Sequence, residues 1–248
     1  MKVTLIQMDL SWADPESNRK KADEAIDSMP GSDLYILPEM FSTGFCTQPE
    51  DVAESSESQT LEWMKKKAAA SGAAIAGSVA VTENGKYYNR LYFVAPDGSV
   101  AHYDKKHLFT FGGEHNHFTA GEQRIVVKWC GVRILLEICY DLRFPVWARN
   151  HGDYDMIIYV ASWPTPRVEA WKTLLAARAI ENQCSVAGVN RVGDDPSNNY
   201  CGGTRMIDPY GKIMAECKDS AEMTVSADVD MEALESFRLK FPVLNDAD

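Results

Sequence analysis

The chain has 248 residues, of which 45% are hydrophobic, and a formal net charge of -11. This length can bury the core of one large α/β domain without disulfides or a structural metal, and we expect a single domain over residues 1–248. No apolar run approaches the roughly 20 residues needed to cross a bilayer, and the negative charge opposes nucleic-acid phosphates. We therefore expect no membrane or nucleic-acid partner, but a small molecule or a second copy of the chain.

The cysteines are scattered, without a CxxC pair or a regular framework that would indicate a zinc site or a disulfide scaffold. They are Cys46, Cys130, Cys139, Cys184, Cys201 and Cys217. The amino-terminal residues "MKVTLIQMDL" also lack the apolar core and the cleavage site of a signal peptide. Both observations favour free thiols in the cytoplasm.

The first third of the chain alternates apolar strands with helical patterns, as expected for an α/β protein. The predicted strands are residues 3–10, 33–38 and 73–81, and the predicted helices are residues 15–29 and 60–72. Pro15 suits the first turn of its helix, and Gly72 suits the left-handed position that ends the second helix.

The rest of the chain adds hairpins to this alternation. Paired strands with turn signals are predicted at residues 87–105, 124–140 and 202–217, with further strands at 155–162 and 184–192 and a helix at 168–183. So many antiparallel turns do not fit a doubly wound sheet. Two mixed sheets packed face to face, with helices outside, would bury these strands, which predicts a four-layer α/β/β/α sandwich.

Polar clusters follow several apolar strands. They are Glu39 after "LYILP", the segment "DKKHLF", the segment "CYDLRFP" that contains Cys139, and "SWPTPR". Because ligands gather outside the carboxyl ends of strands in α/β sheets, these clusters could converge on one pocket. Taken singly each has an ordinary explanation: Glu39 as a solvated acid, Lys105 and Lys106 as a surface pair, and Cys139 as a buried filler.

Histidines suggest two alternatives. His115 and His117 would point the same way on a strand, but no third ligand at matching spacing is evident, so we expect no metal. A cysteine–histidine pair with His102, His107 or His151 is conceivable, although no cysteine-protease signature surrounds Cys139.

Three motifs in order resemble the Glu-Lys-Cys triad of the nitrilase superfamily of carbon-nitrogen hydrolases. They are "LPEMFSTGF" with Glu39, "YDKKHLF" with Lys105 and "CYDLRFPVW" with Cys139, and the resemblance extends to "ARAIENQ" and "DPYGKI". It implies the four-layer sandwich, an enzyme without metal or cofactor, and pairing into a homodimer.

The resemblance also assigns neighbouring residues. It places the catalytic lysine at Lys105 rather than Lys106, and it makes Glu114 a second glutamate that supports the site, with Gly121 closing that motif. Glu137 departs from the family pattern, which has a small or apolar residue there. Strand alternation predicts that Glu137 shares a face with Cys139 and lies close to it.

Among the branches, "CYDLRFPVWARN" and "SWPTPR" are most similar to the omega-amidases, which remove the terminal amide of 2-oxo acids such as 2-oxoglutaramate and 2-oxosuccinamate. The alternatives are a nitrilase, an N-carbamoyl amidohydrolase or an aliphatic amidase with the same triad. A binding protein that kept the fold and lost turnover is the alternative from another class.

A thiol with a pKa of about 8.5 needs a base or a cation to attack an amide. The resemblance implies that Glu39 takes the proton and that Lys105, with the backbone N–H of Tyr140, stabilises the oxyanion. Glu114 would keep Lys105 charged and oriented.

The substrate carboxylate requires an arginine or backbone donors. Arg143 and Arg167 are the candidates, although Arg143 could equally be a structural anchor that pairs with Asp141 or another acid. Trp163 and Phe41 could form apolar walls of the substrate site, or could be core aromatics.

Overall fold

The computed structural model describes residues 1–246, which form two mixed β-sheets packed face to face. The first sheet has the order β15-β1-β2-β4-β5-β6, with β3 paired to β4. Its strands are β1 (Lys2–Gln7), β2 (Leu34–Ile36), β3 (Glu54–Ser55), β4 (Ala74–Glu83), β5 (Lys86–Val94), β6 (Val100–Asp104) and β15 (Met223–Asp228).

The second sheet has the order β14-β13-β10-β9-β8-β7. Its strands are β7 (Val126–Trp129), β8 (Val132–Ile138), β9 (Met156–Ala161), β10 (Ser185–Asn190), β13 (Arg205–Ile207) and β14 (Ile213–Glu216). A separate two-stranded ribbon consists of β11 (Val192–Asp194) and β12 (Asn199–Cys201). The predicted hairpins are present, since β5 pairs antiparallel with β6, β7 with β8 and β13 with β14.

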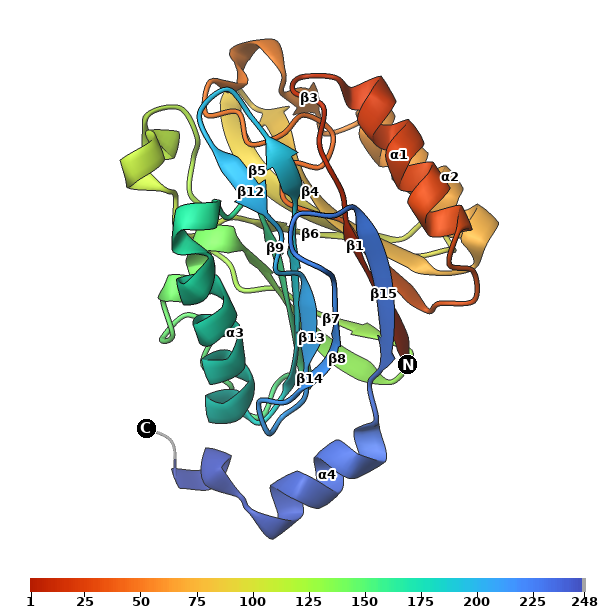
Figure 1. Cartoon of the computed structure of the whole chain (residues 1–248), viewed down its shortest axis with the longest axis vertical. Coiled ribbons are helices and arrows are strands. Elements are labelled where there is room, and N and C mark those ends of the chain that lie inside the picture. The colour runs from red at the N-terminus through yellow and green to blue at the C-terminus, as the bar shows by residue number, and fades with distance from the viewer. Residues whose placement is uncertain (247–248) are drawn as a thin grey trace.

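Helices cover the outer faces of the two sheets. In Figure 1, α1 (Pro15–Asp27) and α2 (Gln59–Ser71) lie on one flank, and α3 (Val168–Asn182) lies on the other. Between them, β1 lies against β10 and β5 lies against β8. The predicted four-layer α/β/β/α sandwich is therefore confirmed. No helix of the described chain combines the length and the apolar character that crossing a membrane requires.

Local sequence explains where the two amino-terminal helices begin and end. Asp14 accepts a hydrogen bond from the Ser17 N–H at 3.1 Å, with Pro15 in the first turn. Ser58 caps α2 in the same way, and Gly72 ends that helix at a φ of 66°, a left-handed conformation that glycine adopts without strain.

Two apolar clusters hold the layers together. One lies under α1 and α2 and includes Tyr35, Leu37 and Ile75. The larger cluster joins both sheets to α3, because both faces of β8 and β9 are buried and the run "MIIYVA" of β9 has no charged side chain.

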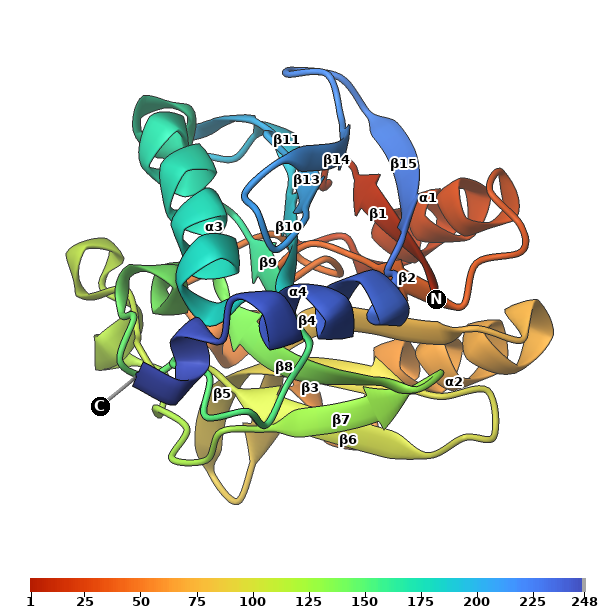
Figure 2. The same ribbon diagram turned by 90° about the horizontal axis from the view of Figure 1, so that it is seen from below.

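The carboxyl-terminal region closes the first sheet and then crosses one end of the molecule. Strand β15 pairs antiparallel with β1, so the sheet contains residues from both ends of the chain. The chain continues into α4 (Met231–Lys240), which crosses the end of the sandwich seen in Figure 2 and lies opposite β12 in Figure 1.

Candidate active site

A cavity of about 470 Å³ opens at the end of the sandwich where the central strands finish. Glu39 follows β2, Lys105 follows β6, Cys139 follows β8 and Ser162 follows β9. Lys105, Cys139 and Ser162 line this cavity. The clusters that follow separate strands in the sequence therefore converge at one end of the two sheets.

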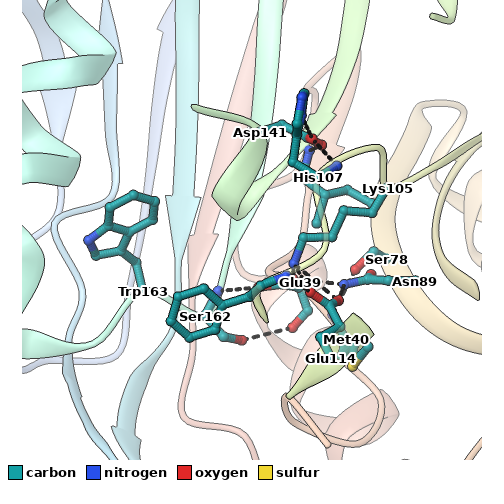
Figure 3. Close-up of polar contacts among 12 residues, drawn as sticks. Glu39, Met40, Ser78, Asn89, Lys105, His107, Glu114, Asp141, Ser162 and Trp163 are labelled. Atoms are coloured by element: carbon teal, nitrogen blue, oxygen red, sulfur yellow. Dashed lines mark hydrogen bonds and ion pairs between the residues drawn. The ribbon is translucent and has the colours of Figure 1, made fainter. Parts of the chain in front are cut away.

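Glu39, Lys105 and Glu114 form a cluster of buried charges beside the cavity (Figure 3). The Lys105 Nζ lies 2.9 Å from the Glu39 Oε1 and 2.9 Å from the Glu114 Oε2, and all three side chains are fully buried. Asn89 on β5 donates from its Nδ2 to Glu39 at 2.8 Å and to Glu114 at 3.2 Å. The two carboxylates therefore share one ammonium and one amide.

Burial and charge act against each other on these groups. Burial alone would lower the pKa of Lys105, but the negative charges of Glu114 and Glu39 outweigh it and raise that pKa. Burial raises the pKa of Glu114, with Lys105 opposing it and Glu39 adding to it. Lys105 therefore stays charged, and the cluster carries a surplus of negative charge when both carboxyls are ionised.

The backbone holds the two carboxylates in place. The Ser162 N–H donates to the Glu39 Oε2 at 2.8 Å, and the Phe109 N–H donates to the Glu114 Oε2 at 2.6 Å. Gly121 donates its N–H to the Lys105 carbonyl at 2.9 Å, and a Cβ there would lie 2.0 Å from the Asp104 carbonyl oxygen. Only glycine allows this close approach behind the lysine.

Cys139 begins a 3-10 helix, Cys139–Arg143, directly after β8 and has a φ of 46°. A non-glycine residue in this region is strained, and such strain clusters at functional sites. The Tyr140 N–H lies in the first turn, where a helix offers it no acceptor within the helix. Burial and the charge of Glu39 raise the pKa of Cys139 well above its usual value, although Lys105 opposes them.

Tyr140, Arg143 and Trp163, which the sequence places among the candidates for substrate binding, all line the cavity. The Arg143 guanidinium lies over the Trp163 ring at 4.9 Å and makes no ion pair with any described residue. The alternative that Arg143 anchors Asp141 is wrong, because Asp141 accepts hydrogen bonds from other residues, among them His107.

Arg167 also lines the cavity. Its guanidinium lies 5.4 Å from the ring centre of Phe109 and 5.9 Å from that of Phe111. Within residues 1–246, no carboxylate forms an ion pair with Arg167. The cavity wall therefore presents two guanidinium groups that are held by aromatic rings and not neutralised.

Phe41 does not line the cavity, so its predicted role as a wall of the substrate site is wrong. It is fully buried in the cluster under α1 and α2, with its ring 5.7 Å from that of Trp63. The backbone adopts a left-handed conformation at Met40, so the side chains of Glu39 and Phe41 point in different directions. Phe41 is a core aromatic, the other possibility that its sequence allowed.

Glu137 lies on β8 whereas Cys139 lies just outside that strand, so strand alternation does not place the two side chains on one face. Glu137 is fully buried opposite Tyr159 of β9, and the charged groups that affect its pKa are Asp141, Arg124 and Arg178, the last of these on α3. Burial is the largest cause of its raised pKa. Cys139 turns out of the strand with a φ of 46°, and it is not among the charged groups that affect the pKa of Glu137.

The two histidines of "EHNHF" do not lie together in a cluster of ligands. His117 Nδ1 lies 2.9 Å from the Glu50 Oε1, and both side chains are partly exposed. Among residues 1–246, no three side chains of His, Cys, Asp or Glu form a group that could hold a metal ion.

Asn89 is the residue of this site that sequence analysis missed. The signal was a single amide in the otherwise apolar and aromatic strand "YYNRLYFV". Buried polar groups are almost always hydrogen-bonded, so a polar residue in the middle of such a strand indicates a polar partner nearby.

The carbon-nitrogen hydrolase model matches residues 2–239, nearly the whole chain. The chain belongs to the carbon-nitrogen hydrolase family. This hydrolase is 44% identical to "Omega-amidase YafV" of Yersinia enterocolitica over 100% of its own length and 97% of that protein. It is 37% identical to "2-oxoglutaramate amidase" of Bacillus subtilis over 98% and 96% of the two chains.

A solved structure with the same fold supports this assignment. The hydrolase superposes with a TM-score of 0.97 on XC1258 of Xanthomonas campestris, described as a CN-hydrolase superfamily protein with an arsenic adduct in the active site. The two are 43% identical over 100% of this chain and 97% of the other. The predicted family is confirmed.

Proposed function

We propose that this enzyme hydrolyses the terminal amide of a small linear 2-oxo acid amide, such as 2-oxoglutaramate or 2-oxosuccinamate, and releases ammonia. The observation that carries this proposal is the pairing of the Lys105–Cys139 site with Arg143 and Arg167 in one cavity. The full-length similarity to proteins named as an omega-amidase and a 2-oxoglutaramate amidase supports it.

The two arginines explain why an anionic amide fits. A 2-oxo acid amide carries its carboxylate at one end and its amide at the other, and guanidinium groups bind carboxylates through two parallel hydrogen bonds. Neither Arg143 nor Arg167 pairs with a carboxylate of the described chain, so the substrate has no internal competitor. The amide end then reaches Cys139.

The first half of the reaction forms a thioester. Because burial and the charge of Glu39 raise the pKa of Cys139, the resting thiol stays protonated, and Glu39 takes its proton as the sulfur attacks. The carbonyl oxygen becomes an oxyanion that Lys105 and the Tyr140 N–H stabilise; one such donor contributes roughly 3 kcal/mol. The carbon–nitrogen bond then breaks, and Glu39 returns its proton to the leaving ammonia.

The second half hydrolyses the thioester. Glu39, again ionised, takes a proton from a water molecule that attacks the thioester carbonyl. The carbon–sulfur bond breaks, the acid product leaves, and the sulfur of Cys139 recovers a proton. Glu114 keeps Lys105 charged throughout, since it lies 2.9 Å from the Lys105 Nζ.

Ammonia release from a panel of compounds tests the substrate class. We expect 2-oxo acid omega-amides to be hydrolysed faster than neutral aliphatic amides, nitriles or N-carbamoyl compounds, and Cys139→Ala to be inactive. Arg167→Met and Arg143→Met should raise KM for the anionic amide by about 10- to 100-fold, as the loss of a charged hydrogen bond predicts, and leave neutral amides unaffected. Preference for neutral amides would overturn the proposal.

We propose also that two copies of the chain pair. An apolar surface near the end of α3 supports this: Ile180, Tyr210 and Phe241 are 54%, 59% and 61% exposed. Phe237 connects them, with ring centres 4.0 Å from Tyr210 and 6.4 Å from Phe241. Exposed apolar patches of this kind mark interfaces. Sedimentation should give a dimer, and Ile180→Asp should give a monomer.

We propose a cytoplasmic location, supported by the free thiols at all six cysteines, including the nucleophile. Fractionation of cells that express the chain from its own gene tests this, and activity in the periplasm or the medium would contradict it.

A further inference from the structure

Asp141 connects the two sheets next to the active site. Its carboxylate is fully buried and accepts hydrogen bonds at both oxygens. The Oδ2 accepts from the Ile138 N–H at 3.1 Å, directly before the nucleophile, and from the Tyr103 hydroxyl at 2.8 Å. The Oδ1 accepts from the backbone N–H of His107 at 2.8 Å and lies 2.7 Å from its Nδ1 (Figure 3).

These partners belong to the two segments that carry Cys139 and Lys105, whose side chains must lie at a set distance for the proposed reaction. Ile138 ends β8 and precedes Cys139, whereas Tyr103 and His107 lie two residues before and after Lys105. Asp141 therefore holds the strand that carries the thiol and the turn that carries the ammonium. The His107 ring also stacks on Phe144, with ring centres 3.9 Å apart and planes 12° apart, so its orientation is fixed.

We propose that Asp141 and His107 are a positioning pair that sets the separation of the Lys105 ammonium from the Cys139 thiol. This inference rests on the proposed reaction, in which Lys105 stabilises the charge that forms at Cys139 and on the oxyanion. In this pair the His107 tautomer with a hydrogen on Nδ1 donates a hydrogen bond to the Asp141 Oδ1, which lies 2.7 Å away. Neither residue lines the cavity, so the pair acts through Lys105 and Cys139.

Two substitutions of His107 separate the hydrogen bond from the space that the side chain fills. His107→Leu removes the donor and keeps an apolar group against Phe144. His107→Asn keeps an N–H at about the position of Nδ1, because the asparagine amide lies at the same distance from the backbone. The matched pair therefore differs mainly in the ability to donate to Asp141.

The measurements are kcat and KM for 2-oxoglutaramate and the rate of Cys139 alkylation by iodoacetamide, corrected with Cys139→Ala for the other thiols. We expect His107→Leu to lower kcat by about 10- to 100-fold with KM changed less than about threefold, because small misplacements of reacting groups cost this much. Alkylation should slow as well, since Lys105 no longer favours the thiolate. His107→Asn should retain most of both activities.

Wild-type kcat and alkylation in a folded His107→Leu variant would overturn the proposal, as would equal losses in both variants. If His107→Leu does not fold, Tyr103→Phe replaces it, because this change deletes the hydrogen bond to Asp141 in a side chain of the same shape, together with the acceptor of the Lys106 N–H and the Trp147 Nε1. An unchanged alkylation rate in Tyr103→Phe would then refute the proposal. Alkylation displaces iodide and needs no amide hydrolysis, so it still tests the proposal if no member of the amide panel is hydrolysed and the proposed function fails.

Discussion

Strands β8 and β9 have a cluster of charges at each end, and the two clusters are opposite in composition. At the carboxyl ends, Lys105 lies between Glu39 and Glu114, and all three side chains are fully buried. At the amino ends, Asp155 lies between Arg133, at 2.7 Å, and Arg238 of α4, at 2.8 Å. The first cluster has one cation for two carboxylates, and the second has two cations for one carboxylate.

This difference decides what each carboxylate can do. Burial would raise the pKa of Asp155, but hydrogen bonds from Arg133 and Arg238 outweigh it and lower that pKa, so the group is a poor base. Glu39 shares its ammonium with Glu114, and its charge helps to keep the nearby Cys139 thiol protonated. The cluster with more carboxylates than cations is thus suited to proton transfer. The cluster with more arginines than carboxylates is suited to holding α4 against the sheet.

Replacing the carboxylate at each end should separate these roles, and the largest effect is expected for Glu39→Gln. Glutamine cannot take the thiol proton, so kcat should fall by about 10²- to 10⁴-fold, the usual contribution of a general base. The amide nitrogen of glutamine must replace one of the two oxygens that accept hydrogen bonds, so the fold should lose about 1.5–3 kcal/mol, roughly 3–12 °C in Tm. Ammonia release and thermal unfolding measure both quantities, and an active Glu39→Gln enzyme would remove Glu39 from the proton transfer.

Asp155→Asn should show the reverse pattern. Asparagine cannot accept from both arginines as the carboxylate does, and hydrogen bonds to charged groups contribute about 1.5–3 kcal/mol. We expect the free energy of unfolding in urea to fall by about 2–3 kcal/mol while kcat stays within about twofold of wild type. A large loss of activity at unchanged stability would mean that the two ends of these strands are coupled.

The contrast also shows what the sequence could predict. Glu39, Lys105 and Cys139 each follow directly on an apolar strand and lie in short motifs, so a reader of the sequence can find them without knowing the fold. The same holds for the helix limits at Pro15 and Gly72, where one residue determines the local backbone.

What the sequence did not predict depends on partners far away in the chain. Arg238 reaches Asp155 across 83 residues, and β15 pairs with β1 from the other end of the chain, so no local pattern indicates either contact. Glu137 and Phe41 failed for another reason. Phe41 directly follows the left-handed residue Met40, and the left-handed Cys139 comes two residues after Glu137; alternation along a strand cannot be extrapolated through such a turn.

Arg238→Gln should destabilise the fold less than Asp155→Asn does, because Arg133 still pairs with Asp155 after the change. The lost contacts also include the hydrogen bonds from Arg238 to the carbonyls of Gln183 and Tyr154. We expect the free energy of unfolding to fall by about 1–2 kcal/mol, and we expect a protease to cut α4 earlier than the rest of the chain. Unchanged proteolysis of α4 would mean that apolar contacts alone hold this helix.

Acid should remove the difference in the free energy of unfolding between wild type and Asp155→Asn. The pKa of Asp155 is lower in the folded chain than in the unfolded chain, where an aspartate titrates near 3.9. Its contribution is therefore complete above about pH 5 and is lost as the pH falls through the folded value. Urea unfolding at pH 7 and at pH 3 should show the stability difference shrinking toward zero. A difference of the same size at pH 3 as at pH 7 would assign it to packing around the side chain, because protonation of Asp155 would then not matter.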